Sequence, residues 1–177
     1  MSGLGFKALS AENWLEPESF LSAIKTMSPT DGTIIEISRE QWLNRFLRPQ
    51  LNGPVPFEIR KLFEVARGAA TYGYFFWPLY TLAGQQLYRV AEAAVSAKCK
   101  SQGASRRKTK TFEDKISFLL DRNVIPQDAW IWWDSIRQLR NHTSHPKSQT
   151  IVMPHDTLYD LSSVAQHIND LFANDAA

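Results

Sequence analysis

Apolar residues recur every three or four positions along most of the chain after residue 55. Such segments begin at Pro56, cover residues 75–100, 112–121 and 127–144, and begin again at Pro154. Because this spacing places side chains on one face of an α-helix, each segment predicts an amphipathic helix. The connections are short, which favours consecutive helices that run up and down beside each other. We therefore expect an all-α, up-and-down helical bundle of four to five helices over residues 56–177.

The N-terminal segment, residues 1–55, has a less regular pattern and is expected to form a small accessory extension. Residues 16–19 predict the start of a helix, because apolar residues follow at helical spacing as far as Met27. Residues 33–37 predict a short strand or an extended connector. Ser38 and Gln41 match a capping box, in which the two side chains satisfy backbone N–H groups at the start of a helix.

The helix that follows Pro56 is predicted to bury one broad apolar face, made of Phe57, Ile59, Leu62, Phe63, Val65 and Ala66. The next predicted helix, residues 75–100, has an apolar face with small residues, which suits close packing of neighbouring helices. That face includes Leu82 and Ala94.

Arginine, asparagine and histidine side chains gather where the second-last predicted helix ends. Arg137, Asn141 and His145 are four residues apart and share one face, with Arg140 in the adjacent row. Pro146 disfavours helical backbone at the preceding residue, so the helix should end at His145. Arginine is always charged and binds phosphate, and histidine titrates near neutral pH. The group can therefore perform acid–base chemistry on a phosphodiester, but the same residues also suit an ordinary polar helix end.

A basic stretch without any acidic residue lies between two predicted helices, and its members are Lys98, Lys100, Arg106, Arg107, Lys108 and Lys110. Gly103, in the middle of the stretch, favours a loop. Such a loop can follow an RNA backbone through salt-sensitive contacts that do not read sequence. The alternative interpretation is a solvated connection between two helices.

Three tryptophans, Trp130, Trp132 and Trp133, begin the helix that ends at the Arg–His group. Tryptophan can stack on nucleic-acid bases. Large apolar side chains at helical spacing more often belong to a core or a subunit interface, which is the role we expect for this group.

Composition limits the class of protein. Hydrophobic residues make up 44% of the chain and charged residues 21%, as in globular proteins, and the formal net charge of +2 does not by itself indicate nucleic-acid binding. Cys99 is the only cysteine, which excludes an internal disulfide and favours a reducing compartment. The N-terminus lacks a signal-peptide pattern and no apolar stretch is long enough to span a bilayer, so we expect a cytoplasmic protein without membrane contact. The four histidines lack the spacing and carboxylates of a metal site, so no metal and no cofactor is expected.

The order Arg140, Asn141 and then His145 resembles the R-x4–6-H signature of the HEPN superfamily, in which a polar residue follows the arginine. Further segments are similar to a broad bacterial branch of uncharacterised HEPN domains, namely residues 57–60, 63–66, 87–92, 115–119 and 136–141. The resemblance covers roughly residues 56–173 and leaves residues 1–55 unexplained.

The resemblance implies a two-fold homodimer of helical bundles with the Arg–His motifs of both chains near one cleft. Many such domains are metal-independent endoribonucleases of toxin–antitoxin or phage-defence systems, with RNA as substrate and an antitoxin or another protein as partner. Others keep the fold without activity, so a non-catalytic module that binds RNA or protein is the alternative function.

Carried onto this sequence, the resemblance implies that Arg140 binds the scissile phosphate, that His145 transfers protons and that Asn141 orients the pair. An acidic residue at the position of Glu92 can face this motif. Arg137 and the six residues of the basic stretch would contact RNA, and the product would carry a 2′,3′-cyclic phosphate.

Overall fold

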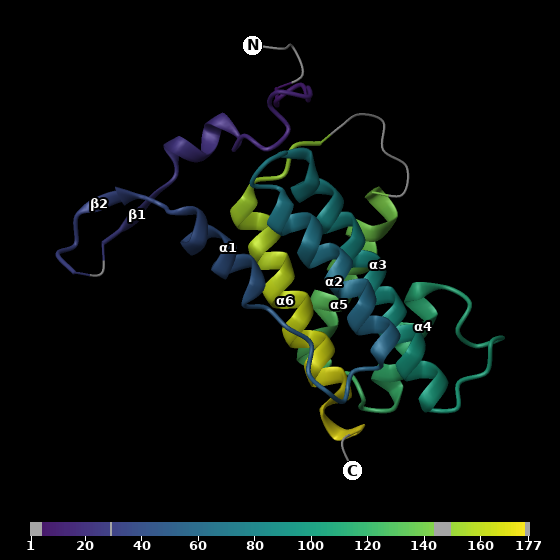
Figure 1. The fold of residues 1–177 in the computed structure, drawn as a ribbon. Coiled ribbons are helices and arrows are strands. Elements are labelled where there is room, and N and C mark those ends of the chain that lie inside the picture. The colour runs from purple at the N-terminus through teal and green to yellow at the C-terminus, as the bar shows by residue number, and fades with distance from the viewer. Residues whose placement is uncertain (1–4, 29, 144–149, 176–177) are drawn as a thin grey trace.

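The computed structural model describes residues 5–28, 30–143 and 150–175, and Figure 1 shows a bundle of long helices with a thinner N-terminal extension at one side. The bundle consists of α2 (Phe57–Tyr72), α3 (Pro78–Ser101), α4 (Phe112–Asp121), α5 (Trp130–Thr143) and α6 (Pro154–Phe172). The expected all-α bundle with a small N-terminal extension is confirmed. Helix α3 is central, because α2, α4, α5 and α6 all pack against it.

Local sequence signals explain where several helices begin. Ser38 and Gln41 form the expected capping box in front of α1 (Arg39–Leu47). Thr111 and Asp114 form a second capping box in front of α4. Helices α3 and α6 begin with Pro78 and Pro154, whose missing N–H group is not needed in the first turn.

One continuous core joins the bundle and the N-terminal extension. In the bundle it contains Phe63, Leu87 and Trp133, each at most 2% exposed. From α1 it contains Trp42 and Phe46. Because α1 packs on α2 and α6, the second half of the extension is part of the same folded body as the bundle.

The first half of the extension differs from the prediction. The helix expected to continue from Glu16 as far as Met27 is wrong: a short 3-10 helix covers Ser19–Ala23, and the chain then forms strand β1 (Lys25–Met27). This strand pairs antiparallel with β2 (Ile34–Glu36), which confirms the strand alternative for residues 33–37. The physical reason is the turn between the strands, where Gly32 has a positive φ of 74° and brings the two strands together.

Helix α2 buries a narrower face than the sequence predicts. Ile59, Phe63 and Ala66 are buried, as expected. Phe57 and Val65 are each 62% exposed and Leu62 is 37% exposed, because α3 and α6 cover only one side of this helix. In α3, Leu82 is also half exposed instead of buried.

No helix in the described part of the chain is long and apolar enough to cross a membrane.

A partly buried carboxyl group, that of Asp160, links α3 to α6. The Tyr88 hydroxyl donates to Asp160 Oδ2 over 3.0 Å. Burial raises the pKa of Asp160, and the neighbouring Asp156 charge raises it further, although the Tyr88 bond opposes these effects. The folded protein therefore retains this proton to higher pH than the unfolded chain does. The free energy of unfolding should therefore fall as pH rises from the pKa of this carboxyl in the unfolded chain through its pKa in the folded protein.

Replacing Asp160 by asparagine keeps an oxygen that accepts from Tyr88 and removes the partly buried charge. We expect Asp160→Asn to raise the thermal midpoint at pH 7 by on the order of 2 °C. The change should be smaller at pH 3, below the ordinary pKa of an aspartate, because the raised pKa of Asp160 keeps the wild-type carboxyl protonated there. Thermal unfolding followed by circular dichroism at both pH values measures this. The control is Asp170→Asn, which changes an exposed residue of the same helix; an equal response of the two variants would contradict the prediction.

Candidate active site

Arg140, in the last turn of α5, contacts Glu92 of the neighbouring helix α3. Its Nε donates to Glu92 Oε2 over 2.8 Å. The other carboxylate oxygen, Glu92 Oε1, lies 3.6 Å from Lys115 Nζ of α4. One carboxylate therefore joins side chains from three helices.

The packing of α5 determines where Arg140 lies. Trp133 and Ile136 precede it at helical spacing, and both are buried in the core. Arg140 continues this row beyond the core, so its stem follows the apolar surface while its head reaches the partly exposed Glu92. On α3, Glu92 follows the fully buried Ala91, which fixes the direction in which its side chain leaves the helix.

The charges of this cluster are unequal. Arg140 and Lys115 provide two positive charges around the single negative charge of Glu92. The side chains of Glu92 and Lys115 are only 22% and 17% exposed, whereas that of Arg140 is 37% exposed. A partly buried carboxylate needs such partners, since an unpaired charge away from water is unfavourable. The excess positive charge and the exposure of Arg140 allow a phosphate to approach its guanidinium group.

Asn141 lies beside Arg140, as the sequence predicts. Arg140 Nη1 donates to Asn141 Oδ1 over a long 3.4 Å. His145 lies outside the described residues. The structure thus brings together two members of the predicted catalytic group and adds Glu92 and Lys115 to them.

Arg137 forms one ion pair within α5 and one with α4. Its Nη2 lies 2.7 Å from Asp134 Oδ1, and its Nη1 lies 3.7 Å from Glu113 Oε2 of α4. The Arg137 bond, followed by one from Gln138, lowers the pKa of Asp134, so this carboxylate stays ionised at neutral pH. A phosphate would have to compete with two carboxylates for Arg137, and its contact with RNA stays a prediction.

The basic stretch divides into one buried and five exposed residues. Lys98 belongs to α3 and is 3% exposed, with its Nζ 5.3 Å from the centre of the Phe172 ring of α6. The prediction that Lys98 contacts RNA is therefore wrong, because the end of α6 covers it. The exposed members are Lys100, Arg106, Arg107, Lys108 and Lys110.

Most of these exposed residues lie on the loop between α3 and α4, which projects from the bundle beside α4 (Figure 1). The loop ends at Thr111, the cap of α4, and Glu113 in the first turn of α4 contacts Arg137 of α5. The last residue of the basic stretch, Lys110, is therefore close in the chain to the α4–α5 contact.

The three tryptophans have different surroundings. Trp133 is buried, which confirms the expected core role for this residue. Trp132 stacks on His167 of α6, with ring centres 3.7 Å apart and planes 3° apart. Trp130 is 43% exposed.

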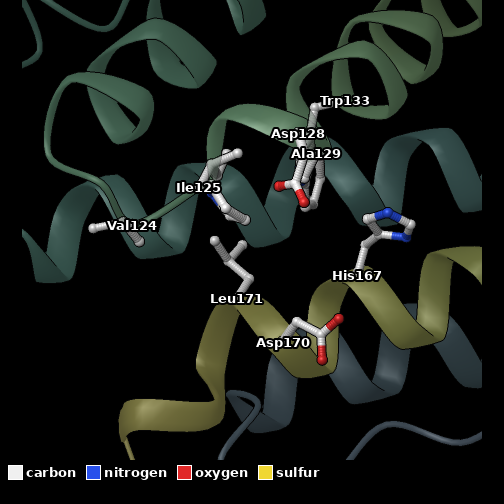
Figure 2. A pocket seen from close by; sticks show the side chains of 9 residues that line it. Val124, Ile125, Asp128, Ala129, Trp133, His167, Asp170 and Leu171 are labelled. Carbon is white, nitrogen blue, oxygen red and sulfur yellow. The ribbon is translucent and has the colours of Figure 1, made fainter.

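A cavity lies between the start of α5 and the end of α6, and sequence reasoning missed it (Figure 2). Its volume is about 400 Å³. Asp128, His167 and Asp170 provide polar groups to its lining, and apolar side chains such as Trp133 line the rest. The His167 Nδ1 lies 2.8 Å from the Ser163 carbonyl oxygen, which can only accept, so this nitrogen carries a proton. These residues are far apart in sequence and show no common motif.

The described residues offer neither a cluster of metal ligands nor a reactive thiol. Among the described residues, no group of three His, Cys, Asp or Glu side chains is arranged to hold a metal ion. Cys99 is 2% exposed, and burial raises the pKa of its thiol to about 11, although Lys115 lowers it slightly. The thiol therefore stays protonated near neutral pH and is a poor nucleophile.

Comparison with known proteins identifies a family but no function. No curated protein and no solved structure matches the chain. The family described as a domain of unknown function, DUF4145, matches residues 74–174, which include α3 to α6 and thus Glu92, Lys115 and Arg140. The resemblance to the HEPN superfamily stays a prediction, since nothing in these comparisons links the two. Because the match covers more than half of the sequence, the chain belongs to the DUF4145 family.

Proposed function

We propose that the protein is a cytoplasmic, homodimeric endoribonuclease that cleaves RNA without a metal ion. The observation that carries the proposal is the pair formed by Glu92 and Arg140. It holds a partly exposed guanidinium group at the end of α5, five residues before His145 in the sequence.

Arg140 acts on the phosphate in this proposal. Its guanidinium group binds the non-bridging oxygens of the scissile phosphate and stabilises the negative charge that develops on them. Glu92 acts as a positioning residue, because its bond to Nε limits the rotation of the guanidinium group before RNA binds. Asn141, bonded to Nη1, limits it further.

Proton transfer requires a second type of group, and His145 supplies it. The 2′-hydroxyl loses its proton to one His145, and its oxygen attacks phosphorus. The bond from phosphorus to the 5′ oxygen breaks, and that oxygen gains a proton from the second histidine, His145 of the partner subunit. The products are a 2′,3′-cyclic phosphate and a 5′-hydroxyl. A dimer explains how a motif with one histidine per chain provides both a base and an acid.

The loop between α3 and α4 supplies contacts with the RNA backbone. Its exposed residues Arg106, Arg107, Lys108 and Lys110 form phosphate contacts that depend on salt and not on sequence. A toxin–antitoxin or phage-defence setting, with an antitoxin or another protein as partner, would suit a nuclease with such limited sequence recognition.

The test is cleavage of single-stranded RNA in excess chelator, with DNA of the same sequence as the control. We expect cleavage of RNA alone, fragments that end in a 2′,3′-cyclic phosphate by mass spectrometry, and loss of cleavage in His145→Ala. Intact RNA, cleavage of DNA, or equal cleavage by His145→Ala would refute the proposal.

A non-catalytic binding module is the second candidate. The observation that favours it is the extensive pairing of arginines on α5, since Arg137 contacts two carboxylates and Arg140 contacts Glu92. Such pairs also stabilise a helix junction that only binds RNA or protein. In that case Arg140→Ala changes RNA affinity or oligomeric state, measured by fluorescence anisotropy and sedimentation, and RNA stays intact with the wild-type protein.

A further inference from the structure

Helices α1 and α6 pack together on the side of the bundle away from α4 (Figure 1). Two adjoining cavities lie along their contact. The first has a volume of about 360 Å³, and the second a volume of about 190 Å³. Arg45 and Leu158 line both cavities, so the two meet at these side chains, and we call the pair of cavities the groove. The groove shares no lining residue with the cluster around Arg140.

The first cavity is basic. Arg45 and Arg48 project from the end of α1, and the facing surface of α6 contributes neutral polar groups such as Ser162 and Gln166. Among the described residues that line either cavity, none is aspartate or glutamate. Arg45 Nη2 donates to Thr26 Oγ1 over 3.3 Å. Among the ion pairs of the described residues, none involves Arg45 or Arg48. Two guanidinium groups without facing carboxylates attract an anion, and their planar N–H groups match the oxygens of a carboxylate or phosphate.

The second cavity is mainly apolar. Ile24, Phe46 and Met153 line it, together with the shared Leu158. Its polar members are Arg45, at the junction with the first cavity, and His155, which lies 3.1 Å from Asp156. An apolar part of a ligand gains free energy by leaving water here. The groove therefore combines a site for an acidic head with a site for an apolar body.

We propose that this groove binds a small organic anion, whose carboxylate or phosphate head lies between Arg45 and Arg48 and whose apolar body fills the second cavity. The inference goes beyond the nuclease proposal and does not depend on it. A different role exists for the two arginines, because positive side chains in the last turn of α1 also stabilise the helix through its dipole. That role requires no ligand and predicts no saturable binding.

The test uses the full chain and the fluorescent probe 8-anilinonaphthalene-1-sulfonate, which carries one sulfonate on an apolar ring system. We expect saturable binding to the folded protein at low ionic strength, and displacement by octanoate and by octyl phosphate. The tighter of these two competitors identifies the head group. Octanol, which lacks the charge, and inorganic phosphate, which lacks the apolar body, should displace the probe poorly.

Two kinds of variant locate the binding. Arg45→Ala and Arg48→Ala should each weaken probe binding about tenfold, as expected for loss of a charged hydrogen bond. Ser162→Glu keeps both arginines but places a carboxylate opposite them, so it should weaken binding as much. Lys61→Ala removes one positive charge from an exposed position of α2 and should leave binding unchanged. Thermal midpoints show that each variant is folded.

Several results would overturn the proposal: no saturable binding to the wild-type protein, equal displacement by octanol, or equal affinities of the groove variants and Lys61→Ala. The alanine variants alone could disturb α1, but Ser162→Glu leaves α1 unchanged and still tests the charge of the groove.

Discussion

Arg140→Ala is expected to lower the rate of RNA cleavage by at least about a hundredfold while the helical bundle stays folded. The size of the effect follows from the loss of a charged donor that faces the negative charge of the transition state. The removed side chain is 37% exposed and lies outside the buried core. Glu92 keeps Lys115 as a partner, and the loss of stability should therefore be modest, about 1 kcal/mol. Single-turnover cleavage of an end-labelled RNA, with urea unfolding in parallel, measures both quantities.

Graded variants separate the charge of Arg140 from its position. Arg140→Lys keeps the charge but loses the planar fork, and should lose activity to an intermediate extent. Glu92→Gln keeps an oxygen that accepts from Nε but loses its charge, so it should lower the rate of the chemical step more than RNA affinity. Lys25→Ala, which removes one positive charge from an exposed position of the N-terminal extension, should cleave at the wild-type rate. Wild-type activity of Arg140→Ala, or equal losses in Lys25→Ala, would contradict this role for Arg140.

Most of the helices, including α1 of the extension, were predictable because their signals are local. Periodic apolar residues, the capping box at Ser38 and the prolines at the starts of α3 and α6 act within a few residues of the helix that they define. The N-terminal strands were less predictable. Each has only three residues, and β1 exists because β2 pairs with it, so the helical spacing around Leu21 and Met27 was a misleading signal.

Burial was harder to predict than helix formation, because it depends on the neighbouring elements. Lys98 belongs to a basic stretch in sequence, but α6 ends over it and places Phe172 against its ammonium group. Phe57 and Val65 have the residue types of a core, but no described element covers them. Periodicity shows which residues share a face, and only the arrangement of the other helices determines how much of that face is buried.

The candidate site was partly predictable. Arg140 and Asn141 are adjacent in sequence, and the spacing of Trp133, Ile136 and Arg140 places Arg140 in line with core residues. The helix stop predicted at His145 lies outside the described residues. Glu92 lies 48 residues before Arg140, and its bond to this residue requires the packing of α5 on α3. No spacing rule links two such distant residues, so only the resemblance to a known superfamily pointed to Glu92 in advance.

Two phenylalanines of helix α2 both fit the apolar pattern of the sequence but differ in burial, so replacing each of them tests what burial contributes to stability. Phe63→Ala should lower the free energy of unfolding by about 3–5 kcal/mol, because it removes a ring that is 1% exposed and leaves a cavity in the core. Phe57→Ala removes the same ring from the same helix at a position that is 62% exposed. The charged groups of Arg60 and Lys61 lie 5.5 and 5.2 Å from the centre of the Phe57 ring. Loss of these contacts in Phe57→Ala should lower the free energy of unfolding by about 1 kcal/mol or less.

Urea unfolding of both variants, at two protein concentrations, tests the burial of each ring and the proposed dimer together. If no second chain covers either ring, Phe63→Ala should lower the free energy of unfolding several-fold more than Phe57→Ala does. Neither decrease should then depend on protein concentration. A loss at Phe57 as large as that at Phe63 would contradict its exposure. If that loss also grew with protein concentration, a second copy of the chain would be covering Phe57, because a subunit interface stabilises the folded state by mass action. The exposed side of α2 would then be the dimer contact that the nuclease proposal requires.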